Sequence, residues 1–257
     1  VGFKSGRIVG FEALVRWAHP ERGLIPPTTF VALAEEMGMI DRLSWFVLRT
    51  ACRHARRWLD LFPLYDKLTL SVNISPRHFE RPGLVEGVLN ILAETGLPAA
   101  NLNLELTENV AIGGDDRTRG ILTGLRQAGI SLCIDDFGTG YAGLQYLHRL
   151  QVDALKIDRS FVQRMTHDQV PHVIESIIDL GRSLGHRVTA EGIETVEQAQ
   201  QLAALGCDYA QGYYFARPLD PDDTESLLSR NPDWSAETGP QPPVAAPAEP
   251  EQPAKPA

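Results

Sequence analysis

Short apolar runs alternate along most of the chain with longer segments whose apolar positions recur every three or four residues. The short runs predict seven strands, at Ile8–Val15, Leu68–Ile74, Leu102–Leu106, Ile130–Ile134, Ala154–Ile157, Arg187–Ala190 and Cys207–Gln211. The longer segments predict helices that include Thr28–Met39, Leu43–Leu61, Leu84–Thr95, Arg117–Ala128, Val170–Leu184, Val196–Leu205 and Asp222–Leu228. Strands that alternate with helices indicate a parallel sheet covered by helices.

A polar residue stands at or just beyond the end of each predicted strand: Glu12, Asn73, Glu105, Asp135, Lys156, Glu191 and Gln211. An open doubly wound sheet and a closed (β/α)8 barrel both fit the alternation, but only a barrel brings all these ends to one face. We therefore predict an α/β fold of the TIM-like (β/α)8 barrel class. The eighth strand is expected before Val1, because Lys4-Ser5-Gly6 is typical of a hairpin turn leading into the first predicted strand.

Composition divides the chain into a domain at residues 1–230 and a tail at residues 231–257. The tail is rich in Pro, Ala, Glu and Gln and has almost no apolar bulk, which predicts disorder. The formal net charge of -9 disfavours binding to a nucleic-acid polymer or to an acidic membrane. The cysteines (Cys52, Cys133 and Cys207) lie far apart, which argues against a structural zinc site and against disulfides.

The sequence contains neither a long apolar window nor a signal segment, which predicts a cytoplasmic domain. Its first residue is Val1 and not Met, so we expect an excised piece of a longer protein, in which a membrane anchor upstream is compatible with these residues.

Asp135 and Asp136 lie side by side where the apolar run Ile130–Ile134 gives way to a turn that contains glycine. Burying an uncompensated charge costs several kcal/mol or more, so adjacent acids at the end of a buried strand predict a cationic partner. One carboxylate of such a pair can bridge two ions while its neighbour binds only the second. Two ions about 3.5–4 Å apart are the usual apparatus for in-line displacement at phosphorus.

Each of the other acidic or amide strand ends has a structural explanation when taken alone. Glu12 can face solvent, Asn73 can cap a turn, and Glu105 with Glu108 can be a strand acid followed by a helix cap. Taken together, they supply only oxygen ligands, which Mg²⁺ and Mn²⁺ prefer. Zinc would require His or Cys, and none of the seven histidines falls at a strand end.

Lys156 can either offset the acidic charge or orient a nucleophilic water, and we favour the second role. Arg16, four residues after Glu12, can clamp a phosphate oxygen. Glu191 and Glu194 add acids after the next strand.

These residues stand in ordered motifs that resemble those of EAL domains, which are bacterial phosphodiesterases of the second messenger cyclic di-GMP. The motifs are Glu12-Ala13-Leu14, Ser71-Val72-Asn73-Ile74-Ser75, Glu105-Leu106-Thr107-Glu108, Asp135–Tyr141, Leu155-Lys156-Ile157-Asp158, Glu191-Gly192-Ile193-Glu194 and Gln211-Gly212-Tyr213-Tyr214-Phe215. The resemblance runs from about Val1 to about Leu228. It implies a modified TIM barrel whose first strand is antiparallel, and truncated in this chain, and hydrolysis of cyclic di-GMP to linear pGpG with two Mg²⁺ or Mn²⁺ ions.

The resemblance also implies a role for each residue. One ion would be held by Glu12, Asn73, Glu105 and Asp135, and the second by Asp135, Asp136 and Glu191. Lys156 would hold or activate the attacking water, and the catalytic set would be Lys156, Glu191 and Glu12. Substrate would be bound by Arg16, Gln211, Asn73 and Glu194. Glu108 would steady the loop after Asp136, which in this family contributes to dimerisation.

The chain departs from the family pattern at few positions. Ala142-Gly143 replace two serines that usually follow the tyrosine, and the family's Tyr-Gln-Pro-Ile strand would precede Val1. Neither Ala142 nor Gly143 stands where a ligand is expected, so we predict an active phosphodiesterase. We expect it to work as a homodimer, with sensor or diguanylate-cyclase-like domains upstream in the parent chain.

Two other functions fit part of this pattern. An inactive EAL-like receptor of cyclic di-GMP is disfavoured, because every expected metal ligand is present. An unrelated barrel such as a glycosidase would explain the acids but not Asn73 and Lys156.

Overall fold

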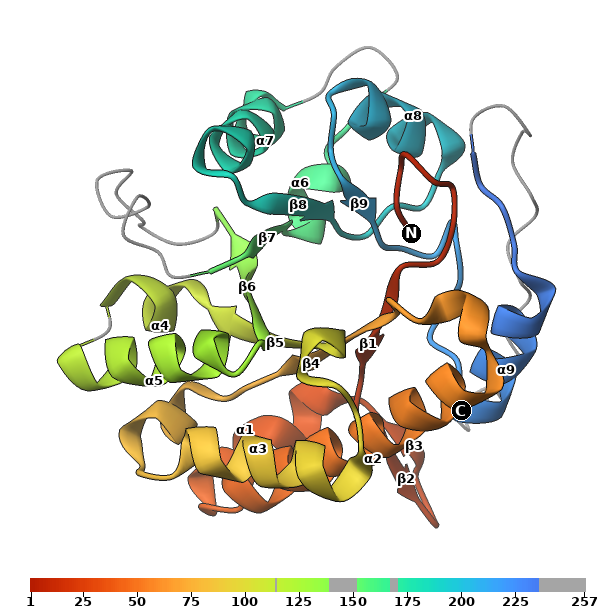
Figure 1. Cartoon of the computed structure of the whole chain (residues 1–257). Helices are drawn as coiled ribbons and strands as arrows, with labels where there is room; N and C mark the ends of the chain where they lie inside the picture. The colour runs from red at the N-terminus through yellow and green to blue at the C-terminus, as the bar shows by residue number, and fades with distance from the viewer. Residues whose placement is uncertain (114, 139–151, 167–170, 236–257) are drawn as a thin grey trace, which may run out of the picture.

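The computed structural model describes residues 1–113, 115–138, 152–166 and 171–235. Its main sheet has seven strands in the order β1-β4-β5-β6-β7-β8-β9, and all neighbours are parallel. The strands are β1 (Gly10–Ala13), β4 (Thr69–Asn73), β5 (Leu102–Thr107), β6 (Ser131–Phe137), β7 (Ala154–Ile157), β8 (Arg187–Ala190) and β9 (Tyr209–Ala210). Figure 1 shows them curving around a common centre, so the predicted α/β fold with a TIM-like arrangement of parallel strands is present.

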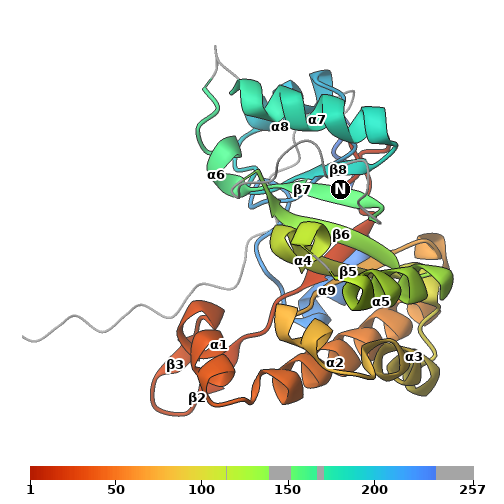
Figure 2. The same ribbon diagram turned by 90° about the vertical axis from the view of Figure 1, so that its left-hand side faces the viewer.

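Helices cover the outer face of this curved sheet, as both ribbon views show (Figures 1 and 2). The described helices are α1 (Pro27–Glu36), which lies beside β2 (Trp17–His19) and β3 (Gly23–Ile25) in Figure 2, and α2 (Ile40–Leu61), α3 (Leu84–Thr95), α4 (Glu108–Gly113), α5 (Asp116–Gln127), α6 (Arg159–Val162), α7 (His172–Leu184), α8 (Val196–Ala204) and α9 (Pro221–Arg230). Short 3-10 turns lie at Pro63–Tyr65, Pro76–Glu80 and Ala99–Asn101. Each predicted helix is present, with ends that shift by up to a few residues.

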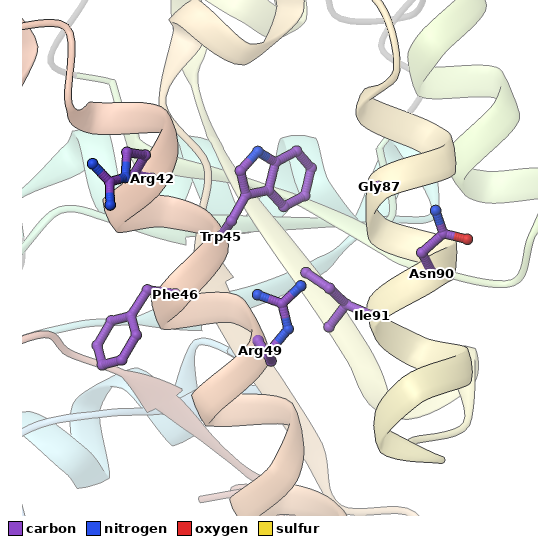
Figure 3. Close-up of a pocket in the computed structure, with 7 residues that line it drawn as sticks. All are labelled: Arg42, Trp45, Phe46, Arg49, Gly87, Asn90 and Ile91. Carbon is purple, nitrogen blue, oxygen red and sulfur yellow. The ribbon is translucent and has the colours of Figure 1, made fainter.

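The outer layer packs closely between α2 and α3. Trp45 projects from α2 onto α3 at Gly87, as Figure 3 shows, where a Cβ atom would lie 2.6 Å from the indole ring. A side chain at position 87 would therefore push the two helices apart. A groove of about 500 Å³ runs beside this contact, and its lining includes Arg42, Phe46 and Asn90.

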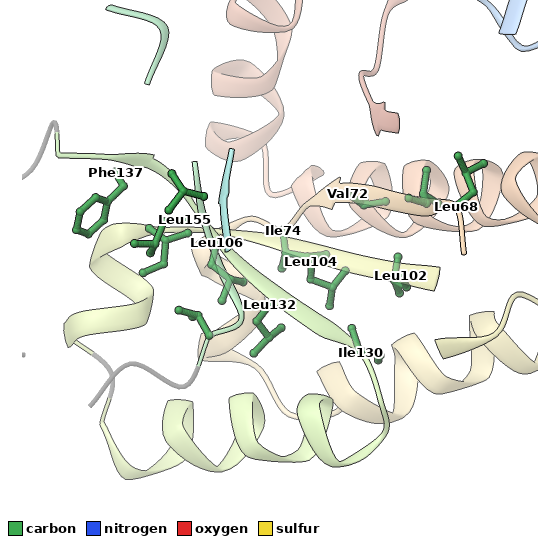
Figure 4. Close-up of a cluster of buried hydrophobic side chains, with 14 of the residues drawn as sticks. Leu68, Val72, Ile74, Leu102, Leu104, Leu106, Ile130, Leu132, Phe137 and Leu155 are labelled. Atoms are coloured by element: carbon green, nitrogen blue, oxygen red, sulfur yellow. The ribbon is translucent and has the colours of Figure 1, made fainter. Parts of the chain in front are cut away.

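Apolar strand residues form the core between the sheet and the helices (Figure 4). Successive side chains of a strand point to opposite faces of the sheet. Leu104 and Leu106 of β5 are therefore buried among other apolar side chains, whereas Glu105 between them faces the inside of the curve. This alternation explains how β5 can carry an acid, Glu105, on its inner face between two leucines that are buried on its outer face.

The first residues of the chain lie against β9. Gly2 forms isolated antiparallel bridges with Arg7 and with Tyr209, and the backbone N–H of Ala210 donates to the carbonyl of Val1 (2.8 Å). The predicted turn at Lys4-Ser5-Gly6 is present, and Gly6 has the left-handed φ of +61° that such a turn requires. An antiparallel first strand is not confirmed, because β1 runs parallel to β4 and the pairing of Gly2 is limited to single bridges.

Two features were not predicted. A small antiparallel hairpin of β2 (Trp17–His19) and β3 (Gly23–Ile25) follows β1. The packed chain also continues past the predicted boundary at residue 230, because Trp234 stacks edge-on against Phe215 at 5.6 Å.

The remainder of the predicted tail, residues 236–257, lies outside the described residues, and so do Ala142 and Gly143. Among the described helices, none has the length and apolar character needed to cross a membrane.

Candidate functional site

Lys156 of β7 lies at the centre of a cluster of carboxylates inside the curved sheet. Its Nζ is 2.5 Å from Glu191 Oε1, 2.9 Å from Glu105 Oε2, and 3.2 Å from both Glu12 Oε2 and Asp135 Oδ1. These acids come from β1, β5, β6 and the residue that follows β8. Lys156 is 3% exposed and Glu105 is 2% exposed, so the central ion pairs are largely removed from water. The structure thus brings together strand ends that span 180 positions of sequence, from residue 12 to residue 191.

Two amide side chains hold Glu12 on its other sides. Asn73 Nδ2 donates to Glu12 Oε1 (2.9 Å), and Gln211 Nε2 donates to Glu12 Oε2 (2.7 Å). Asn73 ends β4, the neighbour of β1, whereas Gln211 follows β9 at the opposite edge of the sheet. Both predicted residues therefore belong to the same cluster as Lys156.

Asp135 and Asp136 can serve one site because the end of β6 is irregular. The pairing of β6 with β7 shifts register between Ile134 and Phe137, and Asp136 has a left-handed φ of 51°. Regular strand backbone would turn two successive side chains to opposite faces. The bulge and the positive φ instead leave ligand oxygens of Asp135, Asp136 and Glu191 within 4.8 Å of one another.

The electrostatics of the cluster show an excess of negative charge. Burial raises the pKa of Glu105 to about 8 and that of Glu191 to about 7, even though Lys156 opposes both shifts. Burial, and then repulsion from Asp135, raise the pKa of Asp136 to about 6. One ammonium does not balance these carboxylates, so the cluster favours either bound protons or further cations.

Glu12 and Lys156 are held in their charged forms. Burial opposes the ionisation of Glu12, but Lys156 and the amides of Gln211 and Asn73 together lower its pKa. Burial would likewise lower the pKa of Lys156, yet the surrounding acids, Glu105 foremost, raise it well above its ordinary value.

Glu108 contacts the segment that follows the paired aspartates. Its Oε2 accepts a hydrogen bond from the backbone N–H of Gly138 (3.3 Å), and Gly138 has a left-handed φ of +93°. Glu108 is 8% exposed, at the start of α4. It therefore anchors the chain two residues beyond Asp136.

Arg16 and Glu194 are not drawn into the cluster. Arg16 is exposed, and its Nη1 donates a hydrogen bond to the carbonyl of Val15 (3.0 Å). Glu194 is exposed beyond the buried Ile193. Within the described part of the chain, neither makes an ion pair with the clustered residues, so their substrate-binding roles stay predictions.

Asp158 is a site residue to which sequence reasoning gave no role. It lies two residues after Lys156, its carboxyl group hydrogen-bonds with Asp136, and it also accepts the backbone N–H of Ser160 (3.0 Å). The motif Leu155-Lys156-Ile157-Asp158 contained the signal, a second acid beside a strand-borne lysine.

Two grooves on the described surface are lined by residues outside the cluster. The first is the α2–α3 groove beside Trp45, and the second, of about 420 Å³, is lined by residues such as Arg126, Ile130 and Asp153 near the start of β6 and β7. Neither is lined by a predicted site residue, so the chemistry of the carboxylate cluster identifies the candidate site.

Comparison with known proteins places the chain in a family. The EAL domain model matches residues 1–218, and the chain therefore belongs to the EAL domain family. MucR of Pseudomonas aeruginosa, a bifunctional diguanylate cyclase/cyclic di-GMP phosphodiesterase, is 42% identical over 226 residues, which make up 88% of this chain and 32% of MucR. This chain spans about a third of the length of the first curated relatives that it matches.

Solved structures agree with the assignment. The PaMucR phosphodiesterase in complex with c-di-GMP is 38% identical, with a TM-score of 0.76 over 93% of this chain and 90% of that chain. BlrP1 of Klebsiella pneumoniae, in a manganese/cyclic di-GMP complex at pH 6, is 33% identical, with a TM-score of 0.66 over 80% of this chain and 50% of that chain.

Proposed function

We propose that this chain is an active phosphodiesterase that hydrolyses cyclic di-GMP to linear pGpG with two divalent cations, Mg²⁺ or Mn²⁺. The observation that carries the proposal is the convergence of Glu12, Glu105, Asp135 and Glu191 on Lys156. Membership of the EAL family supports the choice of substrate, since MucR is a cyclic di-GMP phosphodiesterase and PaMucR and BlrP1 were solved with that nucleotide.

The cluster fits a pair of hard divalent cations. Its donors are carboxylate and amide oxygens, which Mg²⁺ and Mn²⁺ prefer, and its carboxylates outnumber the single buried ammonium. One ion would be held by Glu12, Asn73, Glu105 and Asp135, and the other by Asp135, Asp136 and Glu191. When bound, such ions polarise phosphoryl oxygens and lower the pKa of a bound water.

The chain's own residues then orient the reaction. Lys156 donates a hydrogen bond to the attacking water, and its ion pairs with Glu12 (3.2 Å) and Glu191 (2.5 Å) keep the ammonium in one place. The oxygen of the water forms the new bond to phosphorus as the water loses a proton, and the bond from phosphorus to one ribose oxygen breaks as that oxygen takes up a proton. The product is a linear dinucleotide that keeps a terminal phosphate.

The remaining predicted residues bind or steady the substrate. We propose that Arg16 clamps a phosphate oxygen bidentately, because a guanidinium matches that geometry, and that Glu194, Asn73 and Gln211 line the substrate site. Glu108 fixes the segment after Asp136 through its hydrogen bond to Gly138.

The parent protein is part of the same proposal. We infer that this domain lies in the cytoplasm and works as a homodimer. We also infer that sensor or diguanylate-cyclase-like domains elsewhere in the parent chain regulate it. The bifunctional name of MucR, of which this chain covers 32%, supports such a neighbour.

Incubation of the purified chain with cyclic di-GMP and Mn²⁺ tests the function. We expect pGpG to accumulate, EDTA to stop it, and Asp135→Asn or Glu12→Ala to abolish it. Tight binding of cyclic di-GMP without pGpG would instead identify a receptor. Equal turnover by wild type and both variants would refute the assigned site.

A further inference from the structure

Gln198, in the first turn of α8, bonds to two separate segments of the site. Its Oε1 accepts the backbone N–H of Glu194 (2.8 Å) and that of Thr195 (3.3 Å), while its Nε2 donates to the carbonyl of Val162 (3.2 Å). Backbone N–H groups lie on one side and a carbonyl on the other, so only one orientation of the carboxamide satisfies all three contacts.

The two segments that Gln198 joins are those that carry the central ion pair. Glu194 ends the stretch that begins at Glu191 after β8, and Val162 ends α6, which follows Lys156 by a few residues. Within the cluster, Lys156 Nζ and Glu191 Oε1 are 2.5 Å apart. Gln198 therefore bonds to both segments at one end, at Glu194 and at Val162. At their other ends, Glu191 and Lys156 form the ion pair.

Between these two points the segments are in close contact. Gly192 has a left-handed φ of +72°, and a Cβ atom there would lie 2.5 Å from the Cβ of Arg159. The backbone N–H of Glu191 also donates to the carbonyl of Ile157 (3.2 Å). A small shift of one segment against the other at Gln198 would thus be transmitted to Glu191, because the close contact and the hydrogen bond between them leave little free space to absorb it.

From these contacts we propose that Gln198 is a positioning residue for hydrolysis, which holds Glu191 and Lys156 in register. This inference rests on the proposed function where it is tested by the rate of hydrolysis. The expected effect of Gln198 on Mn²⁺ affinity does not require that the chain hydrolyses cyclic di-GMP. Outer groups that orient metal ligands typically alter affinity or activity about 10–100-fold when they are removed.

Gln198 also caps α8, and one substitution separates the two roles. The side chain of Thr195 accepts the N–H of Gln198, and Gln198 returns the contact to Thr195, which forms a capping box. Glutamate serves in such a box as well as glutamine does. Gln198→Glu therefore keeps the cap and the contact with Glu194 but loses the donor to Val162, whereas Gln198→Ala loses every side-chain contact and keeps only the backbone N–H bond to Thr195.

Gln201 provides a matched control one turn later on α8. Its Nε2 donates to the carbonyl of Thr166 (3.0 Å), which lies further along the chain from Lys156. Gln201→Glu removes a comparable donor and adds the same negative charge to the same helix, and its bond to Thr166 lies four residues beyond Val162 on the chain.

The test compares kcat and KM for cyclic di-GMP, Mn²⁺ affinity by paramagnetic resonance, and Tm among wild type and the three variants. We expect Gln198→Glu and Gln198→Ala to lower kcat equally, by about tenfold. We expect the larger fall in Tm, of about 2–4 °C, in Gln198→Ala, because the side-chain half of the capping box is lost only there. Gln201→Glu should match wild type in kcat.

If Gln198→Glu keeps wild-type kcat and Mn²⁺ affinity, or if kcat falls in proportion to Tm across the variants, Gln198 is only a helix cap and the inference is wrong. If wild type makes no pGpG, the proposed function fails. The inference then stands or falls on whether Gln198→Glu weakens Mn²⁺ binding relative to Gln201→Glu.

Discussion

Gln211 donates a hydrogen bond to Glu12 (2.7 Å) across 199 positions of sequence, and so joins the last strand end of the sheet to the first. Gln211→Glu removes that donor and places a second carboxylate next to the carboxylate of Glu12. We expect the metal-free protein to lose about 1–3 kcal/mol of unfolding free energy, and Mn²⁺ to recover part of the loss. Denaturant titration with and without Mn²⁺ measures both effects.

Gln127→Glu is the control for Gln211→Glu, because it adds the same charge at the end of α5, beside the groove near the start of β6. Equal destabilisation by the two substitutions would show that net charge, and not the contact with Glu12, is responsible.

Removing the central cation should convert the site into one that requires metal to fold stably. Lys156→Met leaves Glu12, Glu105 and Glu191 without their ammonium, and breaking a buried ion pair by removing one partner costs about 3–5 kcal/mol. We expect a large fall in Tm in EDTA, partial recovery in Mn²⁺, and no hydrolysis. Lys67→Met, at an exposed position, should change neither Tm nor turnover. A Lys156→Met protein as stable in EDTA as wild type would contradict the ion-pair assignment.

The stability of the metal-free protein should depend on pH through the buried acids. The pKa of Glu105 is raised from 4.5 to about 8 and that of Glu191 to about 7, so between about pH 5 and pH 8 the folded state holds protons that the unfolded chain has released. Their contribution to the unfolding free energy therefore falls as pH rises. Over the same window Mn²⁺ affinity should rise, with proton release, because the cation displaces those protons.

Glu105→Gln isolates this contribution. Burial lowers the pKa of His78 and that of His186, which gives an opposite slope that both proteins share. Denaturant titrations in EDTA across the window should show a smaller decline of stability with pH in Glu105→Gln than in wild type. Parallel curves for the two proteins would mean that Glu105 is ionised alike in the folded and unfolded states.

The strand ends of the site were predictable because the geometry of a curved parallel sheet is simple. Each apolar run ends in one polar residue, and parallel strands of a curved sheet deliver their carboxyl ends to a common face. Register completes the argument for neighbours such as Asn73 and Glu105, which are paired directly. The predicted convergence of Glu12, Asn73, Glu105, Asp135, Lys156, Glu191 and Gln211 could thus be derived without knowing a single distance.

What the sequence did not reveal depends on local backbone and on contacts between loops. The positive φ of Asp136 occurs where β6 shifts register against β7. The residues Asp135-Asp136 alone do not predict this backbone conformation. The bonds of Gln198 depend on where α6 packs, and Gln198 itself stands in an ordinary helical pattern. The β2–β3 hairpin is formed by mostly exposed residues, so it has no apolar alternation to predict it.

Glu108 should act through the backbone of Gly138. Glu108→Gln keeps an oxygen that accepts the N–H of Gly138, whereas Glu108→Ala removes it. We expect Glu108→Ala to lower kcat about tenfold or more, because the segment after Asp136 loses its anchor, and Glu108→Gln to keep most of the activity. Steady-state kinetics at saturating Mn²⁺ compares them. Equal losses in both variants would show that the charge of Glu108 matters and the hydrogen bond does not.

Anomalous diffraction from crystals grown with Mn²⁺ tests the central claim most directly, namely that the strand-end oxygens hold a pair of divalent cations. We expect two peaks about 3.5–4 Å apart, with Asp135 between them, Glu12 and Glu105 beside the first and Asp136 and Glu191 beside the second. No peak at Asp135, with Lys156 still paired to all four acids in the presence of Mn²⁺, would contradict the account.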